Sequence, residues 1–252
     1  MRLREPEDTM PQRYCTAGFE LQRIGHTDQA SLQKIGELWR EIYDLERGIL
    51  TVPDADEILN DEFHPHSDYF VAYARGQNAS PSFIGSVRVV WDSPAGLPIE
   101  RFFPLQPIKR HSQYVEAQRL MVKPAYRHRR FPGARYGVSG LLMKAVIATT
   151  LISRNHRTIA IDAFGDSRES PIHAFRQMGA SILGSSFIDK ELDSATPSLA
   201  LLLTLQDIAE MSCSHGGNFA RYLLEYEPAI AGLRVTGTTP RMPEQATEAS
   251  LF

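Results

Sequence analysis

The spacing of apolar and polar residues predicts a strand and then a helix at the start of the chain. Apolar and polar residues alternate over 19–24, which is typical of a half-buried strand, and Gly25 ends the run. Beyond a helix cap at Thr27 or Asp28, the apolar positions of 32–45 recur at helical spacing. The chain therefore opens with a strand and an amphipathic helix.

Two runs rich in β-forming residues predict an antiparallel hairpin. They cover 69–73 and 83–91, and a cluster of glycine, asparagine, serine and proline lies between them. The flanking segments differ, because 53–67 is polar and 92–110 carries repeated prolines. We expect the first to be a surface loop or short helix, and the second to be an ordered surface excursion outside the core.

Strands and helices alternate in the second half of the chain. A buried strand is expected at 114–122, and a long helix at 137–153 begins after a basic loop that contains glycine. The later elements are a strand at 158–164, a helix at 170–178 ended by Gly179, strands at 182–188 and 198–205, and a short helix at 219–226. This order predicts an α/β protein of the α+β type, with a mixed central sheet flanked by helices.

The length and composition favour one soluble domain. A chain of 252 residues with 42% hydrophobic and 23% charged residues suits a single α/β core. We expect that domain over 17–230, with flexible segments at 1–16 and 231–252. Residues 1–12 lack the apolar stretch of a secretory leader, and no apolar run is long enough to span a membrane. A cytoplasmic protein without a transmembrane segment is therefore expected.

Cysteine and histidine usage argues against metal centres and disulfides. The two cysteines, Cys15 and Cys213, lie far apart and form neither a disulfide framework nor a CxxC pair. The eight histidines show no helical HxxxH spacing. We therefore expect no metal and no tightly bound cofactor.

Positive charge is concentrated in one stretch, although the net charge is only -3. No aspartate or glutamate occurs between Glu116 and Asp162, and a cluster of cations without acids favours the docking of something anionic. An ordinary solvated face is the alternative, and a nucleic-acid partner is not expected. The cations of this stretch are Arg119, Lys123, Arg127, Arg129, Arg130, Arg135, Lys144, Arg154 and Arg157.

The order of elements over 19–206 resembles the GNAT acyltransferase family. In that family a glycine-bearing loop and the following helix start bind the pyrophosphate of a pantetheine carrier, and unpaired N–H groups and the helix dipole attract such an anion. The run Arg130-Phe131-Pro132-Gly133-Ala134-Arg135 partly matches the family's Q/R-x-x-G-x-G/A pattern. The resemblance implies a donor site built from Met121, Val122, Arg127, Arg129, Arg130, Gly133, Arg135, Gly137 and Gly140.

A more local resemblance concerns the strand at 116–122. Glu116-Ala117-Gln118-Arg119-Leu120-Met121-Val122 is similar to the E-x-S-R-F-x-V strand of acyl-homoserine-lactone synthases and long-chain N-acyl amino acid synthases. Gly85-Ser86-Val87-Arg88-Val89 resembles their G-x-x-R-L strand, and Asp61-Glu62-Phe63-His64 resembles their D-x-x-D segment. The resemblance implies catalytic roles for Glu116, Gln118, Arg119 and Arg88, and substrate contacts from Asp61. Asp162 and Phe164, at the end of the strand 158–164, are further candidates for substrate contacts.

The expected reaction is the attack of an amine on a thioester, which needs a proton acceptor. Glu116 is the candidate base, and backbone N–H groups near Met121 are candidates for binding the oxyanion. Arg119 lies on the opposite face of a regular strand unless a β-bulge intervenes, as it does in GNAT enzymes. A structural ion-pair network that joins Glu116, Arg119 and Arg88 is the alternative.

The resemblance implies an N-acyltransferase that moves a medium or long acyl chain to the amine of an amino acid or similar small molecule. Its donor is an acyl-phosphopantetheine, carried by acyl carrier protein or as acyl-CoA, and the acidic carrier protein is the expected partner of the basic stretch. Three alternatives stay open: an acyl-homoserine-lactone synthase, a coenzyme A dependent acetyltransferase, and a non-catalytic GNAT-like module that binds carrier protein.

Overall fold

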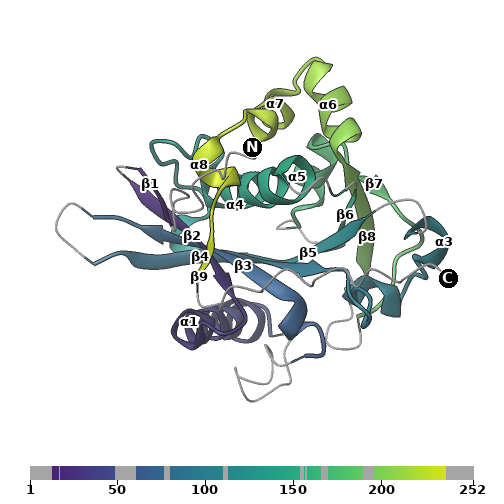
Figure 1. Ribbon diagram of the computed structural model, residues 1–252, viewed down its shortest axis with the longest axis horizontal. Helices are drawn as coiled ribbons and strands as arrows, with labels where there is room; N and C mark the ends of the chain where they lie inside the picture. The colour runs from purple at the N-terminus through teal and green to yellow at the C-terminus, as the bar shows by residue number, and fades with distance from the viewer. Residues whose placement is uncertain are drawn as a thin grey trace, which may run out of the picture.

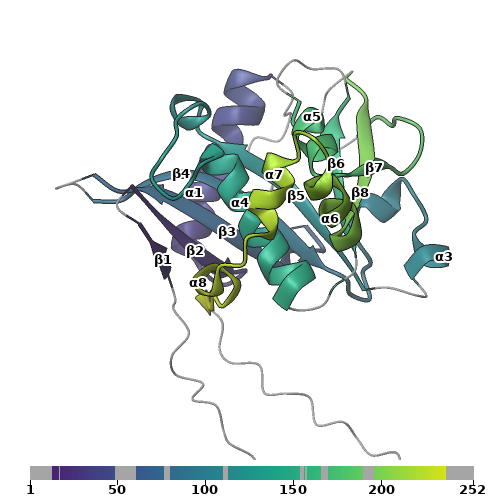
Figure 2. The same ribbon diagram turned by 90° about the horizontal axis from the view of Figure 1, so that it is seen from above.

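A central sheet with helices on both faces organises the described part of the chain (Figure 1, Figure 2). The computed structural model describes residues 13–16, 18–48, 61–76, 80–109, 113–153, 156, 158–165, 170–189 and 196–236. Helix α1 (Gln29–Trp39) covers one face, and α4 (Gly137–Ile147) and α5 (Ile172–Gln177) cover the other. The predicted mixed sheet with flanking helices is therefore present.

The sheet of the described residues contains nine strands, in the order β1-β2-β3-β4-β5-β6-β8-β7, with β9 also paired to β2. The pairs β5·β6 and β2·β9 are parallel, and the other pairs are antiparallel. The strands are β1 (Arg13–Cys15), β2 (Phe19–Gly25), β3 (Ser67–Ala74), β4 (Ser82–Trp91), β5 (Tyr114–Val122), β6 (Thr158–Phe164), β7 (Ser181–Ile182), β8 (Ser198–Thr204) and β9 (Val235–Thr236).

The first helix begins and continues as its sequence predicts. Asp28 caps α1 by accepting a hydrogen bond from the Ser31 N–H at 3.1 Å. Beyond Trp39 the helix continues in π-helical form over Arg40–Glu46. Its apolar side packs on β3 and β5 in one cluster that includes Ile42 and Met121. The helix thus brings its last turns to the end of β5.

The interpretation of β2 as a half-buried strand was wrong, because both of its faces are covered. Glu20 and Arg23 are 3% and 4% exposed. Arg23 forms an ion pair with Asp68 on β3 and lies over the Trp91 ring. Tertiary charge pairing lets polar side chains occupy buried positions, so alternation in the sequence did not reveal which faces were covered.

The proline-bearing segment after β4 contributes to the core, contrary to expectation. It contains the 3₁₀ helix Pro98–Arg101 and helix α3 (Gln106–Lys109). Leu97, Ile99 and Leu105 are each at most 2% exposed and share a cluster with residues of β5, β6 and β8. The repeated prolines limit regular structure in the segment but do not keep its apolar side chains out of the core.

The C-terminal part holds more ordered structure than the sequence patterns predicted. Helix α6 (Leu205–Cys213) directly follows β8, α7 (Asn218–Leu224) confirms the short helix, and α8 (Pro228–Ala231) follows it. Strand β9, which lies within the expected tail, pairs with β2. By contrast, the expected strand 182–188 is reduced to β7 and one isolated bridge at Phe187.

Candidate active site

The structure contains the β-bulge that the resemblance required. Arg119 has a φ of 53°, which is rare for a residue with a side chain. In the pairing with β4, Gln118 lies opposite Arg88 and Met121 lies opposite Ser86. The two residues between them, Arg119 and Leu120, therefore oppose only Val87, so the side-chain alternation of β5 shifts here.

Strands β5 and β6 separate just before this bulge. Their parallel pairing runs from Tyr114↔Thr158 to Ala117↔Ile161 and stops, although both strands continue. Beyond Ala117 the edge of β5 that faces β6 has no strand partner among the described residues. A cavity of about 870 Å³ occupies the separation. Its walls include 117–122 of β5 and 161–164 of β6.

One side of the cavity meets the start of α4. Tyr136, Ser139, Gly140 and Phe219 line it there. The first N–H groups of a helix lack acceptors within the helix, and the helix dipole places partial positive charge at the same end. Gly137 adopts a φ of +72° where the chain turns into the helix, a conformation that favours glycine. This end of the cavity therefore suits an anionic group.

The other side of the cavity is bounded by the π-helical end of α1. Tyr43 and Arg47 line it together with Arg119 and Asp162. Burial, and then the negative charge of Asp189, raises the pKa of Asp162 to about 6. Burial, and then the charge of Asp162, raises the pKa of Tyr43 to about 12. At neutral pH this side therefore presents a carboxylate, a neutral phenol and guanidinium groups.

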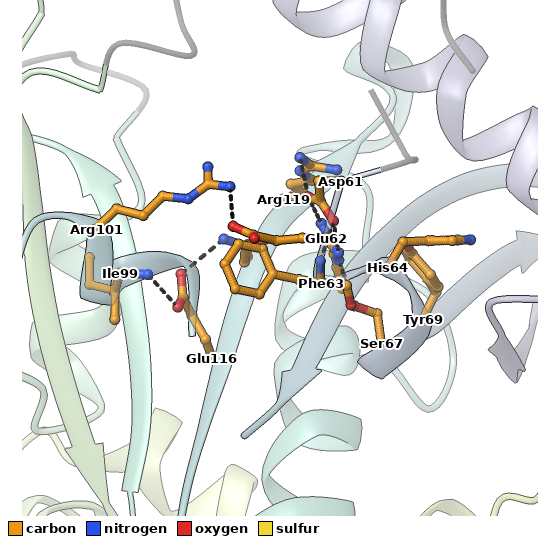
Figure 3. A network of polar contacts seen from close by, with 12 residues as sticks. Asp61, Glu62, Phe63, His64, Ser67, Tyr69, Ile99, Arg101, Glu116 and Arg119 are labelled. Atoms are coloured by element: carbon orange, nitrogen blue, oxygen red, sulfur yellow. Dashed lines mark hydrogen bonds and ion pairs between the residues drawn. The ribbon is translucent and has the colours of Figure 1, made fainter. Parts of the chain in front are cut away.

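Glu116, the expected base, lies behind the cavity wall. Its Oε2 accepts a hydrogen bond from the Ile99 N–H at 2.8 Å, and its Oε1 accepts one from Gln118 Nε2 at 2.9 Å (Figure 3). Glu116 is 1% exposed and is absent from the cavity lining, whereas Gln118 lines the cavity. Burial, and then the charge of Asp162, raises the pKa of Glu116 to about 8. Both carboxylate oxygens already serve protein donors.

Asp61 holds two arginines from the central strands. It accepts hydrogen bonds from both terminal nitrogens of Arg88 at 2.6 Å, and Arg119 Nη2 lies 3.4 Å from its Oδ2 (Figure 3). Arg88 Nε donates to Ser67 Oγ at 2.9 Å. The guanidinium of Arg119 lies 4.1 Å from the centre of the Trp39 ring. Arg88 and Arg119 therefore share an ion-pair network whose acid is Asp61, whereas Glu116, the acid expected from the sequence, accepts hydrogen bonds from Ile99 and Gln118.

The acid-free stretch obtains its counter-charges from distant parts of the chain. Glu46 forms a two-fold ion pair with Arg127, with one contact of 2.6 Å. Glu225 lies 3.6 Å from Arg135 and 3.9 Å from Lys144. These pairs show that the lack of acids within the stretch does not leave all of its cations unpaired.

Three cations of the described part of the stretch are exposed, and one of them, Arg135, is paired with Glu225. Arg129 and Arg130 are exposed, and Arg129 lies over the Tyr126 ring. Arg154 and Arg157 lie outside the described residues. The positive surface left for an anionic partner is therefore smaller than the sequence suggested.

The cavity brings together about half of the expected site residues. Gln118, Arg119, Met121, Val122, Arg127, Gly140, Asp162 and Phe164 line it. The other candidates do not: Glu116, Arg88, Asp61, Arg129, Arg130, Gly133, Arg135 and Gly137 lie outside the lining. Gly133 instead packs closely against the N-terminal segment, because a Cβ at this position would lie 3.0 Å from Thr16.

Several lining residues were missed by sequence reasoning. Tyr43, Glu46 and Arg47 come from the end of the first helix, and Gln177 and Met178 come from α5 and its end. Tyr43 and Arg47 are spaced four residues apart on a helical segment, and the pattern of a core-facing apolar side gave no reason to select them. Only their position beside the separated strands in the folded structure identifies them as residues of the cavity.

Two functional features are absent from the described parts of the chain. No group of three or more histidine, cysteine, aspartate or glutamate residues there could hold a metal ion. Likewise, none of the helices in those parts is long and apolar enough to cross a membrane.

Comparisons with known proteins agree on one fold. A family model described as an acetyltransferase (GNAT) domain matches residues 39–135. No curated protein sequence matches the chain. Among solved structures, FeeM, an N-acyl amino acid synthase from uncultured soil microbes, has a TM-score of 0.56 at 12% identity. That match covers 76% of this chain and 93% of FeeM.

A plant protein gives two similar matches. NAA60 of Arabidopsis thaliana in complex with acetyl-CoA has a TM-score of 0.52 at 13% identity and covers 75% of this chain and 99% of its own. The same protein with a bisubstrate analogue has a TM-score of 0.51 at 13% identity, covering 74% and 98%. At these identities the likeness concerns the fold.

Proposed function

Because a GNAT acetyltransferase family model matches residues 39–135 and the structure has the GNAT fold, we propose that the protein is an N-acyltransferase that joins an acyl chain to the amine of an amino acid. The donor is an acyl-phosphopantetheine thioester on acyl carrier protein or coenzyme A. The observation that carries this proposal is a cavity between β5 and β6 that touches both the start of α4 and the end of α1. Donor and acceptor can therefore bind in the same cavity at the same time.

The donor half of the proposal rests on the α4 side of the cavity. Phosphate bound at the N–H groups before Gly140 leaves the pantetheine arm beside the unpaired edge of β5, whose backbone groups can bind an extended amide-bearing chain. The N–H groups of the Arg119–Leu120 bulge are candidates for the oxyanion contacts. Met121, Val122 and Arg127 border the same path.

The acceptor half rests on the charges at the α1 side. A zwitterionic amino acid needs an acid for its amino group and a cation for its carboxylate. Asp162 supplies the first, and Arg47 and Arg119 supply the second, all from the cavity wall. The solved structure of FeeM, named as an N-acyl amino acid synthase, favours the same acceptor class. Acyl carrier protein is the proposed partner, because Arg129 and Arg130 are exposed cations on the loop after β5.

The direct test offers the protein both kinds of donor. Purified protein is incubated with decanoyl thioesters of acyl carrier protein and of coenzyme A, and separately with acetyl-CoA, in the presence of a panel of amino acids. N-acyl products are identified by mass spectrometry, and released thiol is measured. An N-acyl amino acid with matching thiol release supports the proposal. Absence of both from every combination would refute it.

A further inference from the structure

The two separating strands each carry a polar residue at their first unpaired position. Ala117 and Ile161 form the last pair, and both belong to the core cluster under α4. Since side chains alternate along a strand, the next residues, Gln118 and Asp162, both project from the opposite face. Both line the cavity. Each occupies the first position beyond the last β5·β6 pair, where the two strands part.

Gln118 has a fixed amide with an unused acceptor. Its Nε2 donates to Glu116 Oε1 at 2.9 Å, and this bond sets the orientation of the amide. Its Oε1 is buried and has no hydrogen-bond partner. A buried carbonyl oxygen without a donor is unfavourable, so an N–H group from a cavity ligand would satisfy it. The amino group of the acceptor carries such a donor.

Asp162 is suited to receive a proton at the same place. The charges that act on it come from Asp189, which raises its pKa together with burial, and from Arg119, which lowers it. Its own charge acts in turn on Glu116 and Tyr43. With a pKa of about 6, Asp162 is ionised at neutral pH and can still accept a proton.

We propose that Gln118 and Asp162 together form the amine subsite, in which Gln118 Oε1 orients the amine and Asp162 is the catalytic proton acceptor. This inference rests on the proposed function. The ammonium group of the amino acid first releases one proton to solvent, the neutral nitrogen then forms a bond to the thioester carbonyl carbon, and the C–S bond breaks. The proton shed by the nitrogen moves to Asp162 and then to the departing thiolate, so the products are an amide and a thiol.

Glu116 becomes a positioning residue in this arrangement. The hydrogen bonds from Ile99 and Gln118 to its two oxygens are those of the ionised carboxylate, which prevails above the Glu116 pKa of about 8. That form holds the Gln118 amide with Oε1 directed away from Glu116. Protonated Glu116 would instead donate a hydrogen bond and favour the reversed amide. The residue therefore acts on the amine through Gln118 and has no contact with it.

Kinetics of three variants test the subsite, with decanoyl-coenzyme A and the best amino acid from the panel. Asp162→Asn should lower kcat/KM for the amine about 100-fold and remove the acid limb near pH 6 from the pH profile. Gln118→Met should raise KM for the amine about tenfold with a smaller change in kcat. Coenzyme A affinity, measured by calorimetry, should be unchanged in both. Both KM effects are expected above about pH 8, where wild-type Glu116 is ionised; Glu116→Gln should there resemble Gln118→Met and keep the acid limb.

Asp189→Asn gives a test that does not remove any subsite group. The charge of Asp189 raises the pKa of Asp162, so its loss should move the acid limb to lower pH. If Asp162→Asn retains wild-type turnover and an unmoved acid limb, the subsite assignment is wrong while the proposed function stands. If wild-type protein acylates no amine, the proposed function fails and this inference fails with it. If Asp162→Asn loses coenzyme A binding, the pH profile of Asp189→Asn decides whether the subsite assignment holds. An acid limb at lower pH supports the assignment, and an unmoved acid limb contradicts it.

Discussion

Asp61 accepts hydrogen bonds from both terminal nitrogens of Arg88, at 2.6 Å each, and thereby ties the 61–66 segment to the middle of the sheet. Arg88 is 1% exposed, so its charge depends on this partner. Burial favours protonation of Asp61, but the hydrogen bonds and charge of Arg88 outweigh it and lower the pKa of Asp61. The Asp61–Arg88 pair therefore stabilises the part of the fold that supports the site.

Replacing Asp61 should therefore destabilise the fold. Asp61→Asn leaves the buried charges of Arg88 and Arg119 without their shared acid, and we expect a loss of about 3 kcal/mol in urea unfolding at neutral pH. The neighbouring variant Glu62→Gln breaks an exposed ion pair with Arg101 and should cost less than about 1 kcal/mol. Equal effects of the two variants would contradict the network described here.

The same pair predicts an acid dependence. A carboxyl with a lowered folded-state pKa stabilises the fold above its unfolded pKa, and this contribution is lost as pH falls through the folded value. The difference between wild type and Asp61→Asn should therefore shrink at acid pH below about 4. Urea unfolding at several pH values measures this. A constant difference would show that Asp61 does not act through its charge.

Glu116 should show the opposite dependence. Its pKa is raised from 4.5 to about 8 in the folded chain, so its stabilising effect is complete below the unfolded value and is lost as pH rises through about 8. Between about pH 6 and pH 9, wild type should lose about 3 kcal/mol relative to Glu116→Gln, which cannot ionise. Parallel stability curves for the two proteins would contradict the raised pKa.

Local patterns were sufficient to predict the fold class and most elements. The strands β3 to β6, the helix α1 with its cap at Asp28 and the helix α4 follow from apolar periodicity and turn residues, which act within a few positions. The segment 92–109 shows the limit of this logic. Its prolines predicted a surface excursion, yet Ile99 is buried and its N–H binds Glu116.

The site was predicted less completely, because its parts meet only through the tertiary structure. The strand motif drew attention to Gln118 and Arg119, which both line the cavity, but which face each side chain takes depends on the bulge. Counter-charges such as Glu46 for Arg127 come from remote segments, so the charge pattern along the chain overstated the basic surface. Tyr43 enters the site only because its helix ends beside the parted strands.

The exposed cations of the loop after β5 give a prediction about the donor. The double variant Arg129→Glu, Arg130→Glu should raise KM for decanoyl-acyl carrier protein about tenfold, because reversed charge repels an acidic partner. KM for decanoyl-coenzyme A serves as the internal control and should change little, since neither residue lines the cavity. Added salt should raise the wild-type KM for decanoyl-acyl carrier protein and reduce the difference in this KM between wild type and the double variant. Equal effects on both donors would argue against a carrier-docking role.

Substitutions at Ser139 test the proposed anion site, because their effects on coenzyme A affinity and on protein stability are expected to differ. Ser139 lies in the first turn of α4 and lines the cavity. Ser139→Glu places a negative charge where the donor phosphate is proposed to bind, so coenzyme A affinity should fall about tenfold or more relative to Ser139→Gln, which has nearly the same size. An acid in the first turn of a helix normally favours the helix, so the melting temperature should stay level or rise. Weaker binding in a protein that is not less stable would therefore report repulsion at the site itself. Unchanged coenzyme A affinity in Ser139→Glu would place the donor phosphate elsewhere.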